Sequence, residues 1–217
     1  MLILLVLATA LAADGSQALL ERMRTEQANL RTLKARIEQG KSYPQLGIED
    51  PVERGYLYFE RGKMRLEIQE PEVRILVVKE GKYLLYQPRI RQAISGKVED
   101  QGSQGLFTGL LTGSSGSFRE LEKSYEAFDR GEEVLGERRV HHLTFRARAG
   151  VAVFCQDIEL FLDASLLLPV RQKCREANQS EISLTLSDIV RNAPLEKGLF
   201  EIRIPDGVER IQRGREK

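Results

Sequence analysis

A block of four short β-strands, predicted over Gly55–Pro88, constrains the fold more than any other part of the chain. Its sequence is GYLYFERGKMRLEIQEPEVRILVVKEGKYLLYQP, in which short apolar runs are separated by turn-forming pairs. The run Lys63–Gln69 alternates, so that Met64, Leu66 and Ile68 lie on one face and polar side chains lie on the other. Such strands join into an antiparallel sheet that buries at least one apolar face.

The rest of the chain follows a similar pattern. Apolar and polar positions alternate in Glu181–Val190, and two more strands, Val151–Leu162 and Leu167–Arg175, are expected to form a hairpin. A last strand is predicted at Leu199–Ile204, and a helix at Ser16–Leu30 whose first residue caps it. About ten to eleven strands with few helices predict a mainly β protein of the α+β type. Because a flat sheet of that size is disfavoured, we expect an incomplete antiparallel β-barrel with helices plugging its concave face.

The N-terminus has the features of an export signal. Leu2–Ala12 is an unbroken run of apolar and small residues that ends in an A-x-A pattern, Ala10–Ala12. The run is too short for the roughly 20 residues that cross a bilayer as a helix. We therefore expect residues 1–13 to be a cleaved signal peptide and residues 14–217 to form a single exported domain. No Lys or Arg precedes the run, which leaves a buried N-terminal strand or helix as the alternative.

No cysteine directly follows this cleavage region, so the mature chain lacks the site at which a bacterial lipoprotein is acylated. The mature protein is expected to be free in the periplasm rather than anchored.

The charge balance and the missing motifs argue against several functions. Lys and Arg number 33 and Asp and Glu 32, whereas a nucleic-acid-binding domain carries a clear basic excess. The chain has no G-x-S-x-G, H-E-x-x-H, P-loop or G-x-G-x-x-G motif. Its two histidines, His141 and His142, are strand neighbours that face opposite ways, so a shared metal is disfavoured. We expect no nucleic-acid partner, no metal, no cofactor and no catalysis.

A glycine-rich segment, Asp100–Ser117, differs from the strands around it. Leu106, Phe107, Leu110 and Leu111 lie between glycines, a pattern typical of a short amphipathic helix with flexible joints. One interpretation is a lid whose inner face, formed by these four side chains, covers an apolar cavity. The other is an ordinary helix packed on the core.

The two cysteines fall on the two strands of one predicted hairpin. If Asp163 pairs with Leu166 across the turn, Cys155 lies directly opposite Cys174. Directly opposed residues are about 4.5–5.5 Å apart, which suits a disulfide, and an oxidising exported compartment permits the bond. We favour this disulfide, with a structural role, over two buried free thiols.

Several stretches of the sequence together resemble a known family. They are GYLYFERGKMRLEIQEP and ILVVKEGKYLLYQP, then LLTG at 110–113, LLPV at 167–170, and FEIRIPDGV at 200–208. The family that they resemble is the outer-membrane lipoprotein carrier family, LolA. The resemblance implies an incomplete barrel with a helical lid, and a periplasmic carrier that shields lipoprotein acyl chains.

The partners follow from the same resemblance. Members of the family receive acylated lipoproteins from an inner-membrane ABC transporter and pass them to an outer-membrane acceptor lipoprotein. This chain is expected to use corresponding partners and to act as a monomer. Two rival hypotheses remain: a carrier of another lipid or glycolipid, and a lipid-sensing regulatory protein.

The resemblance also indicates a lipid-binding cavity and a lid tether. The expected cavity residues are Met64, Leu66, Ile68, Ile75, Val77, Leu84 and Tyr86. The sequence pattern does not fix which face of the sheet the last four occupy. The family often has Arg-Pro after the first strand of this block, where the arginine tethers the lid. Here the turn is Glu60-Arg61-Gly62, which makes Arg61 the candidate tether.

Overall fold

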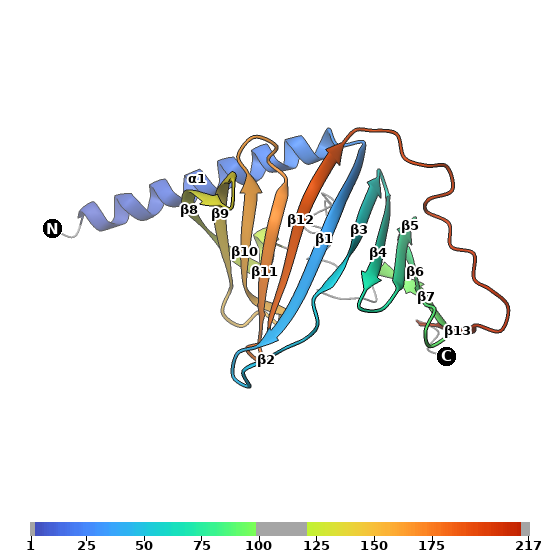
Figure 1. The fold of residues 1–217 in the computed structure, drawn as a ribbon. Helices are drawn as coiled ribbons and strands as arrows, with labels where there is room; N and C mark the ends of the chain where they lie inside the picture. The colour runs from blue at the N-terminus through green and yellow to red at the C-terminus, as the bar shows by residue number, and fades with distance from the viewer. Residues whose placement is uncertain (1–2, 99–120, 214–217) are drawn as a thin grey trace. The chain divides into compact units, whose positions relative to one another are not determined.

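The computed structural model describes residues 3–98 and 121–213, with side chains from Gly15 onward. A long helix, α1 (Ile3–Ala28), comes first and strands follow it (Figure 1). The strands are β1 (Thr32–Tyr43), β2 (Ile48–Glu49), β3 (Glu53–Glu60), β4 (Lys63–Glu70), β5 (Arg74–Lys79), β6 (Lys82–Gln87), β7 (Gln92–Lys97), β8 (Tyr125–Leu135), β9 (Arg138–Ala147), β10 (Cys155–Asp163), β11 (Pro169–Glu176), β12 (Glu181–Arg191) and β13 (Glu209–Gln212).

These strands form one 13-stranded sheet in the order β13-β7-β6-β5-β4-β3-β1-β12-β11-β10-β9-β8, with β2 paired to β1. The hairpins from β3 to β7 and from β8 to β11 are antiparallel, whereas β13 lies parallel to β7. The order is open, because the two terminal strands of the described sheet, β13 and β8, are not neighbours. The predicted mainly β, antiparallel fold is confirmed.

The chain divides into two compact units. The first contains α1, residues 42–48 and residues 106–183, and so includes β8 to β11. The second contains residues 30–41, 49–105 and 184–217, and so includes β3 to β7, β13 and most of β1 and β12. The expectation of a single domain over residues 14–217 stays a prediction.

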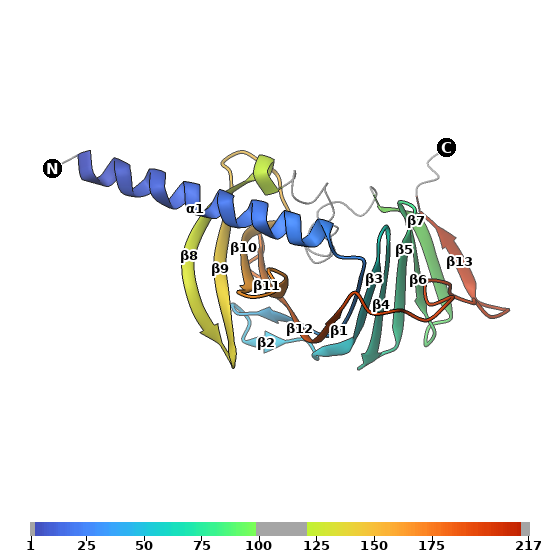
Figure 2. The same ribbon diagram turned by 90° about the horizontal axis from the view of Figure 1, so that it is seen from above.

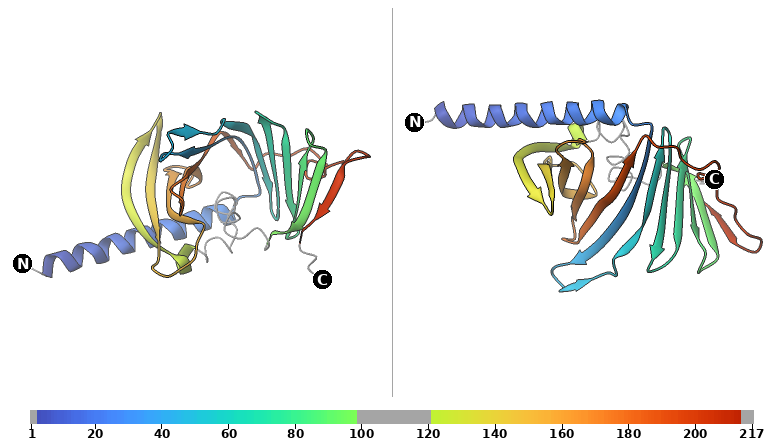
Figure 3. Two further views of the ribbon diagram at one scale, coloured as in Figure 1. Left: turned by 90° about the horizontal axis from the view of Figure 1, so that it is seen from below. Right: turned by 45° about the horizontal axis from the view of Figure 1, so that its top comes forward.

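The core of the first unit lies between α1 and the sheet. Leu19, Leu20 and Met23 of α1 belong to one buried cluster with Leu143 of β9 and Leu160 of β10. Figures 2 and 3 show α1 running across β8 and β9. Burial of a leucine or methionine side chain contributes roughly 1.5–3 kcal/mol, so this apolar side fixes the helix on the strands.

The helix starts earlier than the sequence predicts. It begins at Ile3 rather than at a cap on Ser16, and Ser16 lies inside it with a side chain that is 1% exposed. Residues 3–14 include many Leu and Ala residues and no proline. Leu and Ala are among the strongest helix formers, so no local signal interrupts the helix before Ser16.

The turn between β10 and β11 is organised by the carboxylate of Asp163. Its Oδ1 accepts hydrogen bonds from Ser165 N (2.9 Å), Ser165 Oγ (2.6 Å) and Leu166 N (3.0 Å), and its Oδ2 lies 3.1 Å from Arg138 Nη1. Burial raises the pKa of Asp163, but the hydrogen bonds from Ser165, Leu166 and Arg138 together outweigh it and hold the pKa below its ordinary value. The turn therefore favours the ionised carboxylate.

This turn is longer than predicted, and the register of the hairpin differs accordingly. Asp163 N donates to Leu168 O (3.0 Å), so Asp163 pairs with Leu168 and not with Leu166. Cys174 lies opposite Ile158, and a bulge follows Cys155. The prediction that the two cysteines are directly opposed is wrong, because no local pattern marks the extra turn residues or the bulge.

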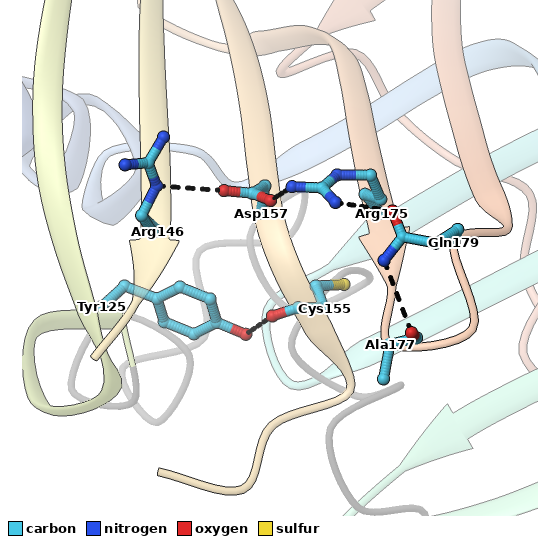
Figure 4. A network of polar contacts seen from close by, with 7 residues as sticks. All are labelled: Tyr125, Arg146, Cys155, Asp157, Arg175, Ala177 and Gln179. Atoms are coloured by element: carbon cyan, nitrogen blue, oxygen red, sulfur yellow. Dashed lines mark hydrogen bonds and ion pairs between the residues drawn. The ribbon is translucent and has the colours of Figure 1, made fainter. Parts of the chain in front are cut away.

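Cys155 and Cys174 nevertheless form a disulfide, with an S–S distance of 2.08 Å and a Cα–Cα distance of 5.3 Å. The bulge places the two residues diagonally across the hairpin, still within bonding reach. Figure 4 shows the polar contacts around it: Tyr125 Oη donates to Cys155 O (2.8 Å), while Arg146 and Arg175 both reach Asp157. Strands β8 to β11 are thus joined by side chains as well as by the backbone.

Loss of the disulfide is expected to destabilise the protein without changing its fold. The bond closes a loop with a sequence separation of 19 residues, for which chain entropy gives about 3 kcal/mol. The double variant Cys155→Ala/Cys174→Ala should lose about that much unfolding free energy in urea titrations. Reductant should lower the wild-type stability to the same level and leave the variant unchanged. Equal stability of oxidised and reduced wild type would contradict the expectation.

The C-terminal region departs from the prediction. Residues 199–204, which the structure describes, are not a strand; the pairing segment is β13, which the sequence did not predict. Phe200, Ile202 and Ile204 are half-buried and alternate with exposed residues. This alternation of half-buried and exposed side chains shows that the segment is extended, although its backbone does not pair with the sheet. Figure 2 shows this segment running from β12 to β13.

Candidate functional site

The strand register assigns each side chain of the second unit to one of two faces of its sheet. Directly paired residues of neighbouring strands share a face. Leu66 pairs with Leu57 of β3 and with Leu76 of β5, Leu76 pairs with Leu85 of β6, and Leu85 pairs with Ile94 of β7. We call the side that carries these residues the Leu66 face. Met64 and Ile68 lie on it too, as the sequence predicts.

The Leu66 face carries an unbroken apolar row. Leu57 also pairs with Ala35 of β1, so the row crosses the six adjacent strands from β1 to β7. Strands are about 4.8 Å apart, and the row therefore measures about 24 Å along the sheet. That is comparable with an extended long acyl chain.

Exposure increases along this row. Ala35 and Leu57 are 0% and 1% exposed, whereas Leu66, Leu76, Leu85 and Ile94 are half-buried. The part of the row on β4 to β7 therefore keeps accessible apolar surface. Four adjacent aliphatic side chains without a charge between them make a surface suited to hydrocarbon. Each CH₂ group of a ligand that is buried on this surface contributes about 0.8 kcal/mol to the binding free energy.

Four of the expected cavity residues lie on the other side of the sheet, which we call the Val77 face. Val77 pairs with Leu84, and Ile75 pairs with Tyr86. Val77 pairs on its other side with Arg65, a residue that points away from Leu66. The expectation that all seven residues line one cavity is therefore wrong: three share the Leu66 face and four share the Val77 face.

The Val77 face carries charged side chains beside its apolar ones, and the C-terminal segment partly covers it. Arg65 forms an ion pair with Glu67 (2.7 Å) and donates from Nη1 to Leu199 O (3.0 Å). Lys63 Nζ lies 5.7 Å from the centre of the Phe200 ring. Burial raises the pKa of Tyr58 on this face, and the Glu67 carboxylate raises it further. Charges and an extended segment make this side unsuited to a hydrocarbon ligand.

A polar hollow of about 270 Å³ also opens on the Val77 side, near the start of β3. Its walls include Arg36, Arg54 and Glu38. Arg54 pairs with Glu38 (3.0 Å) and Glu70 (3.7 Å), and Arg36 lies 3.7 Å from Asp188. Both arginines thus face carboxylates, which partly offset their positive charge.

Gly55 sets the close contact of β3 and β4 at the end of the Leu66 face. A Cβ atom there would lie 1.9 Å from the backbone oxygen of Glu67 and 2.9 Å from the Cα of Ile68. A register irregularity between Arg54 and Gly55 accompanies this approach. Glycine is required because the neighbouring atoms belong to the backbone and cannot turn aside.

The expected lid and its tether are only partly visible. Leu106, Phe107, Leu110 and Leu111 lie outside the described residues, so the lid stays a prediction. Arg61 lies in the turn between β3 and β4, and its backbone N–H donates to Arg31 O (3.3 Å). Its role as a tether is likewise untested.

The histidines have no metal-binding arrangement. His142 stacks on Phe161 with ring centres 4.3 Å apart and has Glu159 3.7 Å from its Nε2, while His141 faces Glu132. Within the described side chains, no group of three or more His, Cys, Asp or Glu residues is placed to hold a metal ion. Over the described residues, no helix is both long and apolar enough to span a membrane.

Sequence reasoning missed Leu76, Leu85 and Ile94, although one signal was available. The two-residue turn Glu80-Gly81 pairs Lys79 with Lys82, and counting back from that pair places Leu76 opposite Leu85. The link from β4 to β5 has no such two-residue turn. The sequence therefore did not show that Leu76 pairs with Leu66 and lies on the same face.

Comparison with known proteins identifies the fold. No protein-family model matches the sequence, and no curated protein matches it. Among solved structures, an uncharacterized conserved protein from Thermus thermophilus aligns with a TM-score of 0.61 at 16% identity, over 92% of this chain and 99% of its own. MucB of Pseudomonas aeruginosa aligns with a TM-score of 0.58 at 13% identity, over 88% of this chain and 63% of that chain.

The lipoprotein LppX of Mycobacterium tuberculosis aligns with a TM-score of 0.51 at 15% identity, over 83% of this chain and 98% of its own. At these identities the likenesses concern the fold alone. The chain shares with these structures a large open antiparallel sheet with few helices, which is the architecture that the resemblance to the LolA family implies.

Proposed function

We propose that this protein is a periplasmic carrier that shields the acyl chains of lipoproteins on the Leu66 face and delivers them toward the outer membrane. The observation that carries the proposal is the half-buried row Leu66, Leu76, Leu85 and Ile94, which offers apolar surface across four adjacent strands. The export signal predicted from the N-terminal sequence supports the periplasmic compartment. The fold is similar to that of LppX, which is itself a lipoprotein, and this similarity supports a function that involves lipoproteins.

The proposed action is binding and release, without catalysis. A ligand that buries a few CH₂ groups gains about 0.8 kcal/mol for each, so a single chain provides useful affinity. An inner-membrane ABC transporter and an outer-membrane acceptor lipoprotein are the proposed partners, on the basis of the sequence resemblance. The glycine-flanked segment around Leu106 would gate release.

A second candidate function is a lipid-sensing regulatory protein, and the likeness to MucB supports the protein-binding part of that candidate. MucB has been solved in complex with MucA, so a protein of this fold binds a protein partner. The alignment covers 63% of the MucB chain. A regulator would hold a protein partner in place of, or together with, a lipid.

Mass spectrometry of the mature protein, isolated gently from its native periplasm, separates these functions. The carrier proposal expects co-purifying acylated lipoproteins. Free lipids alone would replace it with a carrier of other lipids. A protein partner without acylated cargo would contradict the carrier and favour the regulator. Lipoproteins stripped of their acyl groups serve as the control, and they should not bind when added back.

A further inference from the structure

The accessible apolar row on the Leu66 face continues onto β13, the last strand of the second unit. Ile211 of β13 pairs with Ile94 of β7, so the two side chains share a face, and both are half-buried. The accessible row therefore consists of Leu66, Leu76, Leu85, Ile94 and Ile211, and it crosses five neighbouring strands. We call these five residues the apolar strip.

Polar side chains border the apolar strip along one side. Residues two positions away along a strand share its face, and on β5, β6, β7 and β13 these residues are Arg74, Gln87, Gln92 and Glu209. Arg74 forms an ion pair with Glu53, and Gln92 Nε2 donates to Glu209 Oε2 (3.1 Å). A hydrocarbon chain that ran along these strands would cover polar groups and remove them from water, which is unfavourable.

On its other side the apolar strip adjoins side chains that are already covered. Met64 of β4 and Tyr83 of β6 are 6% and 5% exposed. Tyr83 pairs with Gly96 of β7, and its ring lies 2.8 Å from the position that a Cβ of Gly96 would occupy. A hydrocarbon chain on this face therefore keeps most of its apolar contact when it runs across the strands, along the apolar strip.

We propose that the apolar strip sets the preferred length of the bound acyl chain, and that Ile211 binds the far end of that chain. Four strand spacings of about 4.8 Å give a strip of about 19 Å. A C–C bond of about 1.5 Å at a tetrahedral angle advances an extended chain by about 1.25 Å, so about 16 carbons span the strip. The strip ends at β4 because Leu57 of β3 is 1% exposed, and at β13 because that strand terminates the described sheet.

This inference rests on the proposed carrier function and specifies which acyl chains of lipoproteins the carrier prefers. A shorter chain leaves part of the apolar strip uncovered, so less apolar surface is removed from water. A longer chain extends past Ile211, and its additional CH₂ groups stay in water and add no affinity. Strand β13 is then part of the ligand site as well as part of the sheet.

A series of acyl peptides that differ only in chain length tests the preferred length. The ligands carry one saturated chain of about 10 to about 20 carbons on the same fluorescent peptide, so that they bracket the length of the strip. For the wild type, the dissociation constant should fall about fourfold for each added CH₂ group. It should level off at about 16 carbons.

Ile211→Ser tests the far end of the apolar strip. The strip should shorten by one strand spacing, so the dissociation constant should level off about four carbons earlier, near 12 carbons. The affinity for the shortest ligands should equal that of the wild type, which also shows that the variant is folded. Gln212→Ser is the matched control, because Gln212 is the exposed next residue of β13 and lies on the opposite face. It should keep the limit of the wild type.

Three results would overturn the role of the apolar strip. One is a wild-type affinity that keeps rising up to the longest chain, and another is a wild-type limit that is already near 12 carbons. The third is an unchanged limit in Ile211→Ser. A wild type that binds none of the acyl peptides would instead overturn the carrier function itself, so the two failures are distinguishable.

Discussion

Replacing Leu66 by glutamate should abolish acyl-chain binding and leave the protein folded. Leu66 is half-buried in the middle of the apolar row, so a carboxylate there retains access to water in the ligand-free protein. An acyl chain laid over it would have to desolvate the charge, which costs several kcal/mol. We expect the dissociation constant for a fluorescent palmitoyl peptide to rise at least about a hundredfold, with circular dichroism unchanged.

Leu84→Glu is the matched control, because it is the same change at another half-buried leucine. Leu84 pairs with Val77 and therefore lies on the Val77 face. If the Leu66 face binds the ligand, Leu84→Glu should bind the palmitoyl peptide like the wild type. Retained binding by Leu66→Glu, or equal loss in both variants, would reject the assignment of the site to this face.

Gly55→Ala should cause a large loss of stability, although it adds only one methyl group. The new Cβ would overlap the backbone oxygen of Glu67 at 1.9 Å, so β3 and β4 must separate. Forced overpacking of this kind costs about 3 kcal/mol or more. Chemical denaturation should show a lower midpoint, and hydrogen exchange should show faster opening of β3 and β4 than of β9 and β10.

Gly62→Ala is the control for the glycine substitution itself. Gly62 lies in the turn of the same hairpin with φ of +74°, and nothing lies within 4 Å of an added Cβ. Gly62→Ala should lower the unfolding free energy only by the cost of holding alanine in a left-handed backbone conformation, about 1 kcal/mol. Equal destabilisation by the two variants would mean that the close approach of β3 and β4 does not determine the outcome.

Strand identity could be predicted from this sequence more reliably than strand face. The block Gly55–Pro88 forms β3 to β6 within a few residues of the expected bounds, because turn-forming pairs separate its apolar runs. Val73–Val78 is apolar at successive positions, so its pattern does not show which residues face which side of the sheet. An error of one residue in the assumed strand register moves every side chain to the other face. The sequence therefore left the face of Ile75 and Val77 open, and the register places both on the face opposite to Leu66.

Other differences come from interactions that local pattern does not encode. The disulfide was predicted from a register that proves incorrect, and it forms because a bulge after Cys155 compensates for the longer turn. β13 pairs with a strand more than a hundred residues earlier in the chain. Gln172 looks in the sequence like an ordinary polar position of an alternating strand, whereas the structure buries it fully.

The short strand β13 also has a consequence for solubility. An uncovered strand at a sheet edge offers unpaired backbone groups to other copies of the chain, and it invites aggregation. β13 covers the outer edge of β7 with only four residues, Glu209–Gln212, of which two are charged. A short charged edge strand is a poor template for further strand addition. The chain's own C-terminal segment thereby discourages self-association at that edge, a useful property in a protein that keeps apolar side chains accessible.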